Sequence, residues 1–103
     1  MINKAPLEIP NEVIETFCLK WKIEELALFG SVLRGDFRPD SDIDVLATFA
    51  ADAKWGLFDH ARMREELSAL LGREADVVQP TGLRNPFRRH EILATRRIIY
   101  AAR

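Results

Sequence analysis

A pattern of glycine, serine and aspartate in the first half of the chain could bind a phosphate and a metal ion. Gly30-Ser31 follows the apolar run 26–29. This order is typical of a strand that leads into the N-terminus of a helix. Free backbone N–H groups and the helix dipole favour a phosphate at such a position. Ten residues separate Ser31 from Asp42, and Asp42 and Asp44 open a second apolar run. On a strand both carboxylates point to one face, with Cα atoms about 6–7 Å apart.

These side chains predict metal-assisted phosphoryl chemistry. Two carboxylates on one face suit a pair of divalent ions about 3.5–4 Å apart. Hard oxygen ligands favour Mg²⁺, with Mn²⁺ as the alternative. His60 and His90 have no second His or Cys at ligand spacing, so a zinc site is not expected. The sequence also holds neither a Walker motif nor G-x-G-x-x-G.

Asp76 is a candidate third carboxylate. It lies between Ala75 and Val77, where a charge is costly to bury without a partner. If the strand over 74–79 lies beside the strand over 42–49, Asp76 would complete a three-carboxylate site. There it would act as a general base for an attacking hydroxyl. The alternatives are an exposed residue at a strand end or an ion pair with Arg73.

Other charged residues near this pattern allow a structural as well as a functional interpretation. Arg34 follows Ser31 by three residues, so it would contact a phosphate, hold a carboxylate or serve the fold alone. Asp36 and Asp40 are expected to form turns or to pair with Arg38.

The composition predicts a single domain over residues 1–103, with its core at about 11–100. The chain has 103 residues, of which 48% are hydrophobic, enough for a packed interior. No apolar run approaches the ~20 residues of a membrane span, and the N-terminus lacks the pattern of a signal peptide. We therefore expect a cytoplasmic protein without membrane contact. Cys18, the single cysteine, lies on an apolar helical stripe and is expected to be structural.

The charge balance argues against stable nucleic-acid binding. The formal net charge is −1, without the basic footprint of a nucleic-acid binder. Acids cluster at 36–44, whereas arginines gather toward the C-terminus. This basic end is either a solvated helix face or a docking surface for an acidic or phosphorylated partner. Its members are Arg84, Arg88, Arg89, Arg96, Arg97 and Arg103.

Periodicity predicts a small α/β or α+β domain, a mixed sheet flanked by helices. Asn11 is expected to cap the first helix, Gly72 to end the second long helix, and Trp21 to lie in the core. Two of Trp55, Phe58 and Phe87 are expected in the core and the third at an interface. Helices are predicted over 11–25, 30–35, 57–71 and 87–94, strands over 26–29, 42–49 and 74–79, and either a strand or a continuing helix over 98–100.

The motif L-F-G-S-x-x-R-G-D-x-R-P-D-S-D-I-D-V-L strongly resembles the minimal nucleotidyltransferases of the DNA polymerase beta-like superfamily. Their signature is Gly-Ser, ten residues, then Asp-x-Asp, which this chain matches without a gap. Downstream, L-L-G-R-E-A-D-V-V resembles the strand with the family's third carboxylate, which falls on Asp76. The resemblance covers about residues 11–100 and implies the polymerase-beta-like nucleotidyltransferase fold.

The resemblance also implies an activity, transfer of AMP from ATP with release of pyrophosphate. Gly30 and Ser31 would bind the triphosphate, Asp42 and Asp44 would hold two Mg²⁺ ions, and Asp76 would ligate one ion and activate the acceptor hydroxyl. Many relatives have a basic residue directly after Gly-Ser. This chain has valine at position 32, which predicts weaker phosphate contact with the metal ligands intact.

Larger members of the superfamily carry extra domains for the acceptor, so a partner is expected to supply it here. Minimal nucleotidyltransferases are commonly paired with a HEPN-domain toxin, whose tyrosine they can AMPylate as antitoxins. Two alternatives stay open. The chain could neutralise its partner by stoichiometric contact, with nucleotide incidental. It could also transfer to a small molecule or an RNA end, although the near-neutral charge and the lack of a base-stacking patch disfavour RNA.

Overall fold

The structure is a computed structural model that describes residues 9–33 and 42–102. The expectations for Arg34, Asp36, Arg38, Asp40 and Arg103 lie outside the described residues. The elements are α1 (Asn11–Lys20), β1 (Ile23–Phe29), the 3₁₀ helix η1 (Gly30–Leu33), β2 (Ile43–Phe49), α2 (Leu57–Leu71), β3 (Ala75–Val78), the 3₁₀ helix η2 (Pro80–Gly82), α3 (Pro86–Thr95) and β4 (Arg97–Ala101).

Four strands form one mixed sheet in the order β3-β2-β1-β4. β1 is central and pairs antiparallel with both β2 and β4. β2 and β3 are parallel, and α2 connects them. A parallel pair needs such a crossover because its strands run the same way. The segment over 98–100, for which the sequence allowed either a strand or a continuing helix, belongs to the strand β4. The predicted mixed sheet flanked by helices is confirmed.

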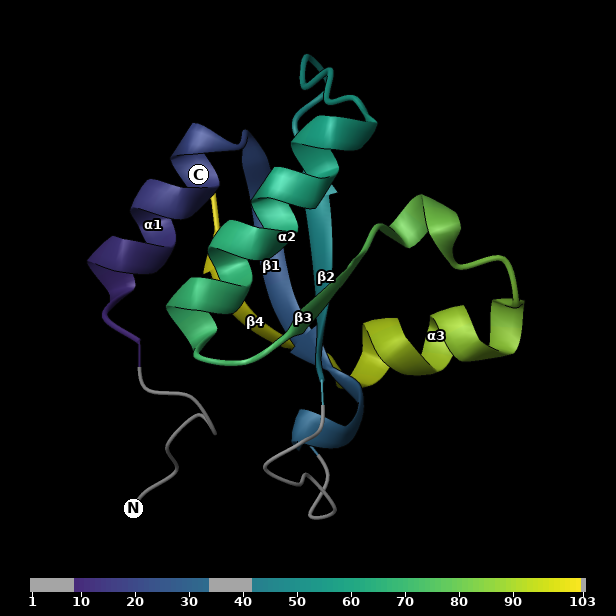
Figure 1. The fold of residues 1–103 in the computed structure, drawn as a ribbon. Helices are drawn as coiled ribbons and strands as arrows, with labels where there is room; N and C mark the ends of the chain where they lie inside the picture. The colour runs from purple at the N-terminus through teal and green to yellow at the C-terminus, as the bar shows by residue number, and fades with distance from the viewer. Residues whose placement is uncertain (1–8, 34–41, 103) are drawn as a thin grey trace.

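Each face of the sheet has its own helical cover (Figure 1). α1 and α2 pack on one face over the larger hydrophobic core, whereas α3 packs on the other over a smaller cluster. Ile43 and Val45 belong to the larger core and Leu46 to the smaller one, so neighbours along β2 alternate between faces. The smaller cluster comprises Ala27, Phe29, Leu46, Leu83 and Ile92.

Trp21 lies in the core, as predicted, and ties the end of α1 to α2. Its indole N–H donates to Glu66, 3.0 Å away, and Lys20 donates to the same carboxylate at 2.6 Å. These two donors, Lys20 first, lower the pKa of Glu66 below its ordinary value. The Trp55 indole donates to the Trp21 carbonyl and meets the Trp21 ring edge-on, with ring centroids 5.1 Å apart.

Two predictions about α1 were wrong. The helix ends at Lys20 instead of residue 25, because Lys22 adopts a left-handed φ of 55° and turns the chain into β1. Asn11 is not the N-cap: it is already helical, and Pro10 precedes it. The Pro10 carbonyl accepts from the backbone N–H groups of Val13 and Ile14. In contrast, α2 has its predicted bounds and ends at Gly72, whose φ is 74°.

The expectation that two of three aromatic residues lie in the core was also wrong. Phe58 and Phe87 are 84% and 85% exposed, while Trp55 packs partly buried against the larger core. Cys18 is buried, and desolvation raises the pKa of its thiol to about 12, which fits the predicted structural role. Across the described ranges, no helix has the length and apolar character needed to cross a membrane.

Truncating Leu67 should destabilise the fold far more than truncating Leu57 on the same helix. Leu67 is 1% exposed and Leu57 is 84% exposed. Leu67→Ala should lower the free energy of unfolding by about 2–5 kcal/mol, because it leaves a cavity in the larger core. Leu57→Ala should change it by less than about 0.5 kcal/mol. Urea unfolding measures both; equal losses would contradict the described packing of α2.

Glu66→Gln should make the molecule less stable at neutral pH. A carboxylate with a lowered folded-state pKa adds stability above the ordinary glutamate pKa of about 4.3, and this stability is lost as pH falls through the folded value. The carboxylate is partly exposed, so the expected loss at pH 7 is about 0.5 kcal/mol, shrinking below about pH 4. Urea unfolding at several pH values tests this. Glu65→Gln is the control, and a pH-independent loss in Glu66→Gln would refute the assignment.

Candidate functional site

Gly30 directly follows β1, and its backbone lies against the carboxylate of Asp44. Its φ is +79°, and a Cβ built on it would lie 2.4 Å from Asp44 Oδ2. The antiparallel register brings this about, because Phe29, the residue before Gly30, pairs with Asp44. Both the conformation and the contact require glycine. The Gly-Ser turn of the predicted phosphate site is therefore adjacent to a predicted metal ligand.

Asp44 and Asp76 lie side by side on neighbouring strands. They are register partners in the parallel β2–β3 pair, so their Cα atoms are about 4.8 Å apart and their side chains share a face. It is the face that α3 covers, since Leu46, two residues after Asp44, packs with Ile92. Asp44 is half-buried and Asp76 exposed. The condition set for Asp76, that its strand lies beside the strand of Asp44, is therefore met.

The other predicted residues are less closely tied to this pair. Asp42 is exposed and precedes the first residue of β2. Ser31 lies in η1, directly after Gly30. Val32 is 3% exposed and belongs to the larger core, so the position after Gly-Ser offers no side chain to a phosphate.

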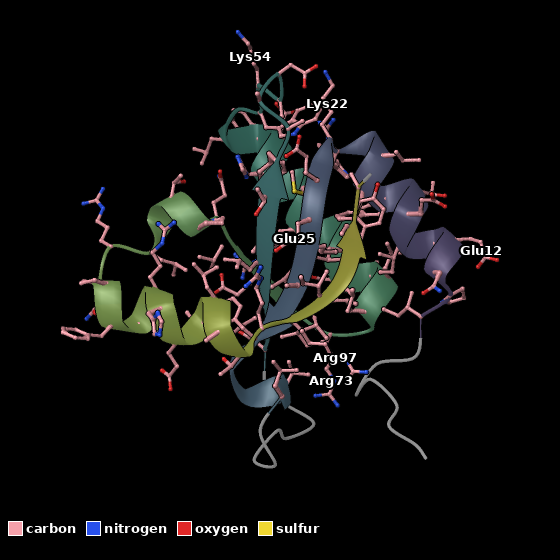
Figure 2. The ribbon with its side chains drawn as sticks, turned by 180° about the vertical axis from the view of Figure 1, so that it is seen from behind. Glu12, Lys22, Glu25, Lys54, Arg73 and Arg97 are labelled. Carbon is pink, nitrogen blue, oxygen red and sulfur yellow. The ribbon has the colours of Figure 1, made fainter. Side chains whose placement is uncertain are left out.

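A cleft of about 380 Å³ opens between the Gly30–Asp44 contact and α3. Leu33 of η1 lines it on one side, and α3 supplies most of the other side. Figure 2, which views the molecule from behind, shows α3 on the face of the sheet opposite α1 and α2. The contribution of α3 to this cleft was not predicted from the sequence. The sequence signal for it is helical spacing, which places positions 88, 91, 92 and 95 on one face. These positions hold Arg88, Glu91, Ile92 and Thr95.

The carboxylates offer the hard oxygen donors that Mg²⁺ prefers, and Gly30 leaves open the space that a Cβ would fill in front of Asp44. Among residues 9–33 and 42–102, no three His, Cys, Asp or Glu side chains form a group that could hold a metal ion. Mg²⁺ is usually bound through one or two carboxylates together with substrate phosphates and water. The residues present fit that kind of site.

Gly30 lies against Asp44, and Asp44 pairs with Asp76 on a mixed sheet flanked by helices, an arrangement compatible with an enzyme of nucleotidyl transfer. The sequence profile of the nucleotidyltransferase domain matches residues 10–99, so the chain belongs to this family. It is 33% identical over 66 residues to the protein adenylyltransferase MntA of Thermococcus cleftensis, covering 64% of this chain and 65% of that protein. A Methanocaldococcus jannaschii protein named as a candidate protein adenylyltransferase is 35% identical over 71 residues, covering 69% and 73%.

Solved structures agree with this assignment. A candidate minimal nucleotidyltransferase, 36% identical, superposes with a TM-score of 0.67 over 84% of this chain and 85% of that one. A toxin–antitoxin structure with AMP-PNP gives a TM-score of 0.69 over 92% and 76%, at 18% identity. The second likeness shows the fold alone. The predicted fold class and the predicted class of enzyme are both confirmed.

Three glycine substitutions should separate the contact with Asp44 from backbone strain. Gly30→Ala combines a positive φ with the clash at Asp44, Gly72→Ala has a positive φ and an open surrounding, and Gly82→Ala has neither. Gly30→Ala should lose affinity for ATP·Mg²⁺ as well as stability. Gly72→Ala should lose about 1–2 kcal/mol of stability alone, and Gly82→Ala should change little.

A fluorescent ATP analogue measures the affinity, and urea unfolding measures the stability. If Gly30→Ala and Gly72→Ala bound the analogue equally well, the Gly30–Asp44 contact would have no part in nucleotide binding.

Proposed function

We propose that this nucleotidyltransferase transfers AMP from ATP to a hydroxyl group of a partner protein. The observation that carries the proposal is the pairing of Asp44 with Asp76 beside the Gly30 backbone. In this proposal, that arrangement brings a triphosphate-binding turn, a metal ligand and a proton acceptor together on one surface. The protein adenylyltransferases among its relatives favour a protein as acceptor.

In this proposal each residue has a distinct role. Gly30 and Ser31 hold the triphosphate through backbone N–H groups, and Arg34, three residues after Ser31 in the sequence, would add a positive charge. Asp42, Asp44 and Asp76 would hold two Mg²⁺ ions, which would offset negative charge on the entering and leaving oxygens.

Asp76 accepts the proton of the attacking hydroxyl. A bond forms between the acceptor oxygen and the α-phosphorus, and the bond from the α-phosphorus to the bridging oxygen breaks. Pyrophosphate leaves, and AMP stays on the acceptor. Asp76 suits the role because it is exposed, so an acceptor hydroxyl can approach it from solvent.

The proposed acceptor is a tyrosine of a HEPN-type ribonuclease, and the chain would act as its antitoxin. Solved toxin–antitoxin structures share this fold, and one of them was determined with AMP-PNP. Their identity to this chain is 17–18%, so they support a compatible architecture, and the pairing itself belongs to the proposal. Exposed Phe58 and Phe87 offer apolar contact area for a partner.

Label transfer tests the proposal directly. With α-labelled ATP, Mg²⁺ and the protein encoded beside this chain, the wild type should label that protein. Asp76→Asn should slow transfer about 10²–10⁴-fold through loss of the proton acceptor, and Asp44→Asn at least as much. Asp52→Asn is the matched control, because Asp52 is exposed and pairs with Lys22, which precedes β1 at the opposite end of the β1–β2 pair from Asp44.

Two results would contradict the proposal. Absence of label from the wild-type reaction would exclude transfer to that protein. Full protection of cells by Asp44→Asn would favour the alternative, neutralisation by a stoichiometric complex.

A further inference from the structure

Arg88 is the one cationic side chain among the described residues that line the cleft beside Gly30 and Asp44. It is exposed, and the structure gives its guanidinium no hydrogen bond or ion pair within the described ranges. An arginine with its five donors unused in a cleft next to a candidate metal ligand is available to bind an anion.

Packing of α3 directs Arg88 into this cleft. Ile92 is the buried residue of α3, and it packs with Phe29 and Leu46 on the sheet. Arg88 is one helical turn before Ile92, so it lies on the same face.

The neighbouring arginines are placed differently. Arg89 donates to the Pro80 carbonyl at 3.2 Å and is not part of the cleft. Arg84 precedes α3, is exposed and does not line the cleft either. Of these three arginines, Arg88 alone faces Gly30 and Asp44.

A cation is needed in this cleft if a triphosphate is to bind there. Asp44 and Glu91 line it, and Val32 is buried, so η1 brings no cation from that position. A bound triphosphate would add several negative charges. Metal ions would offset part of this charge, and a guanidinium matches the geometry of two phosphate oxygens.

We propose that Arg88 binds the triphosphate of ATP in the cleft between η1 and α3, across from Gly30. This inference rests on the proposed use of ATP and assigns to the C-terminal half of the chain a part in nucleotide binding. Arg88 would hold the triphosphate from the side of α3, while backbone N–H groups hold it from the side of β1.

Titration of the full chain with a fluorescent ATP analogue and Mg²⁺ tests this, with inorganic triphosphate as competitor. Arg88→Gln should weaken binding of both ligands about 10–100-fold, the loss expected for a charge-assisted hydrogen bond pair. Arg88→Lys should recover part of the affinity, because it keeps the charge without the fork. Arg84→Gln removes the same charge outside the cleft and should stay within about twofold of wild type. Thermal unfolding should be alike in all four proteins.

The outcomes separate this inference from the function on which it rests. Wild-type affinity in Arg88→Gln would overturn it, as would a loss for the ATP analogue without a loss for inorganic triphosphate. Equal losses of affinity in Arg84→Gln and Arg88→Gln would indicate a general effect of charge and would overturn the inference too. If the wild type binds ATP but labels no partner, the proposed transfer fails while Arg88 keeps its role. A wild type that binds no ATP would overturn both.

Discussion

The Gly30 backbone packs against the Asp44 carboxylate so closely that no side chain fits between them. This contact depends on the antiparallel register of β1 and β2, which pairs Phe29 with Asp44. The register depends in turn on the burial of alternate residues on the two faces of β2, because a shift by one position would exchange the faces. The carboxylate pair is therefore positioned by the sheet itself, with the Gly-Ser turn as its continuation.

The two faces of the sheet contribute differently to the molecule. The face under α1 and α2 holds most of the buried hydrophobic residues, and the Trp21–Glu66 hydrogen bond joins the two helices. The opposite face carries Asp44 and Asp76, and its cover, α3, buries Ile92 alone. An ion pair between Arg96 and Glu25, 3.0 Å apart, helps to fix the end of this helix to β1. Stability is concentrated on one side, which leaves polar and charged groups accessible on the other.

Local sequence signals predicted most of the fold and the centre of the site. Apolar periodicity and Gly72 gave the bounds of α2, and the run at 26–29 predicted the strand that lies at the centre of the sheet. The end of α1 escaped prediction because Lys22, neither glycine nor asparagine, takes the left-handed turn. The exposure of Phe58 and Phe87 reflects their places in the first turns of helices whose apolar sides pack further along. Helical spacing places Arg88 on the same face of α3 as Ile92, but the docking of that face beside Gly30 and Asp44 is a tertiary contact with no local signal.

The parallel pairing of β2 and β3 has a consequence for the order in which the molecule assembles. Gly30 and Asp44 belong to adjacent antiparallel strands, whereas Asp76 reaches Asp44 after the chain has formed α2 and crossed over. Contacts across longer separations cost more loop entropy and form more slowly. Folding that begins with β1 and β2 would thus bring Gly30 and Asp44 together early and add Asp76 late. A nascent chain would then hold the Gly-Ser turn beside Asp44 before the carboxylate pair is complete.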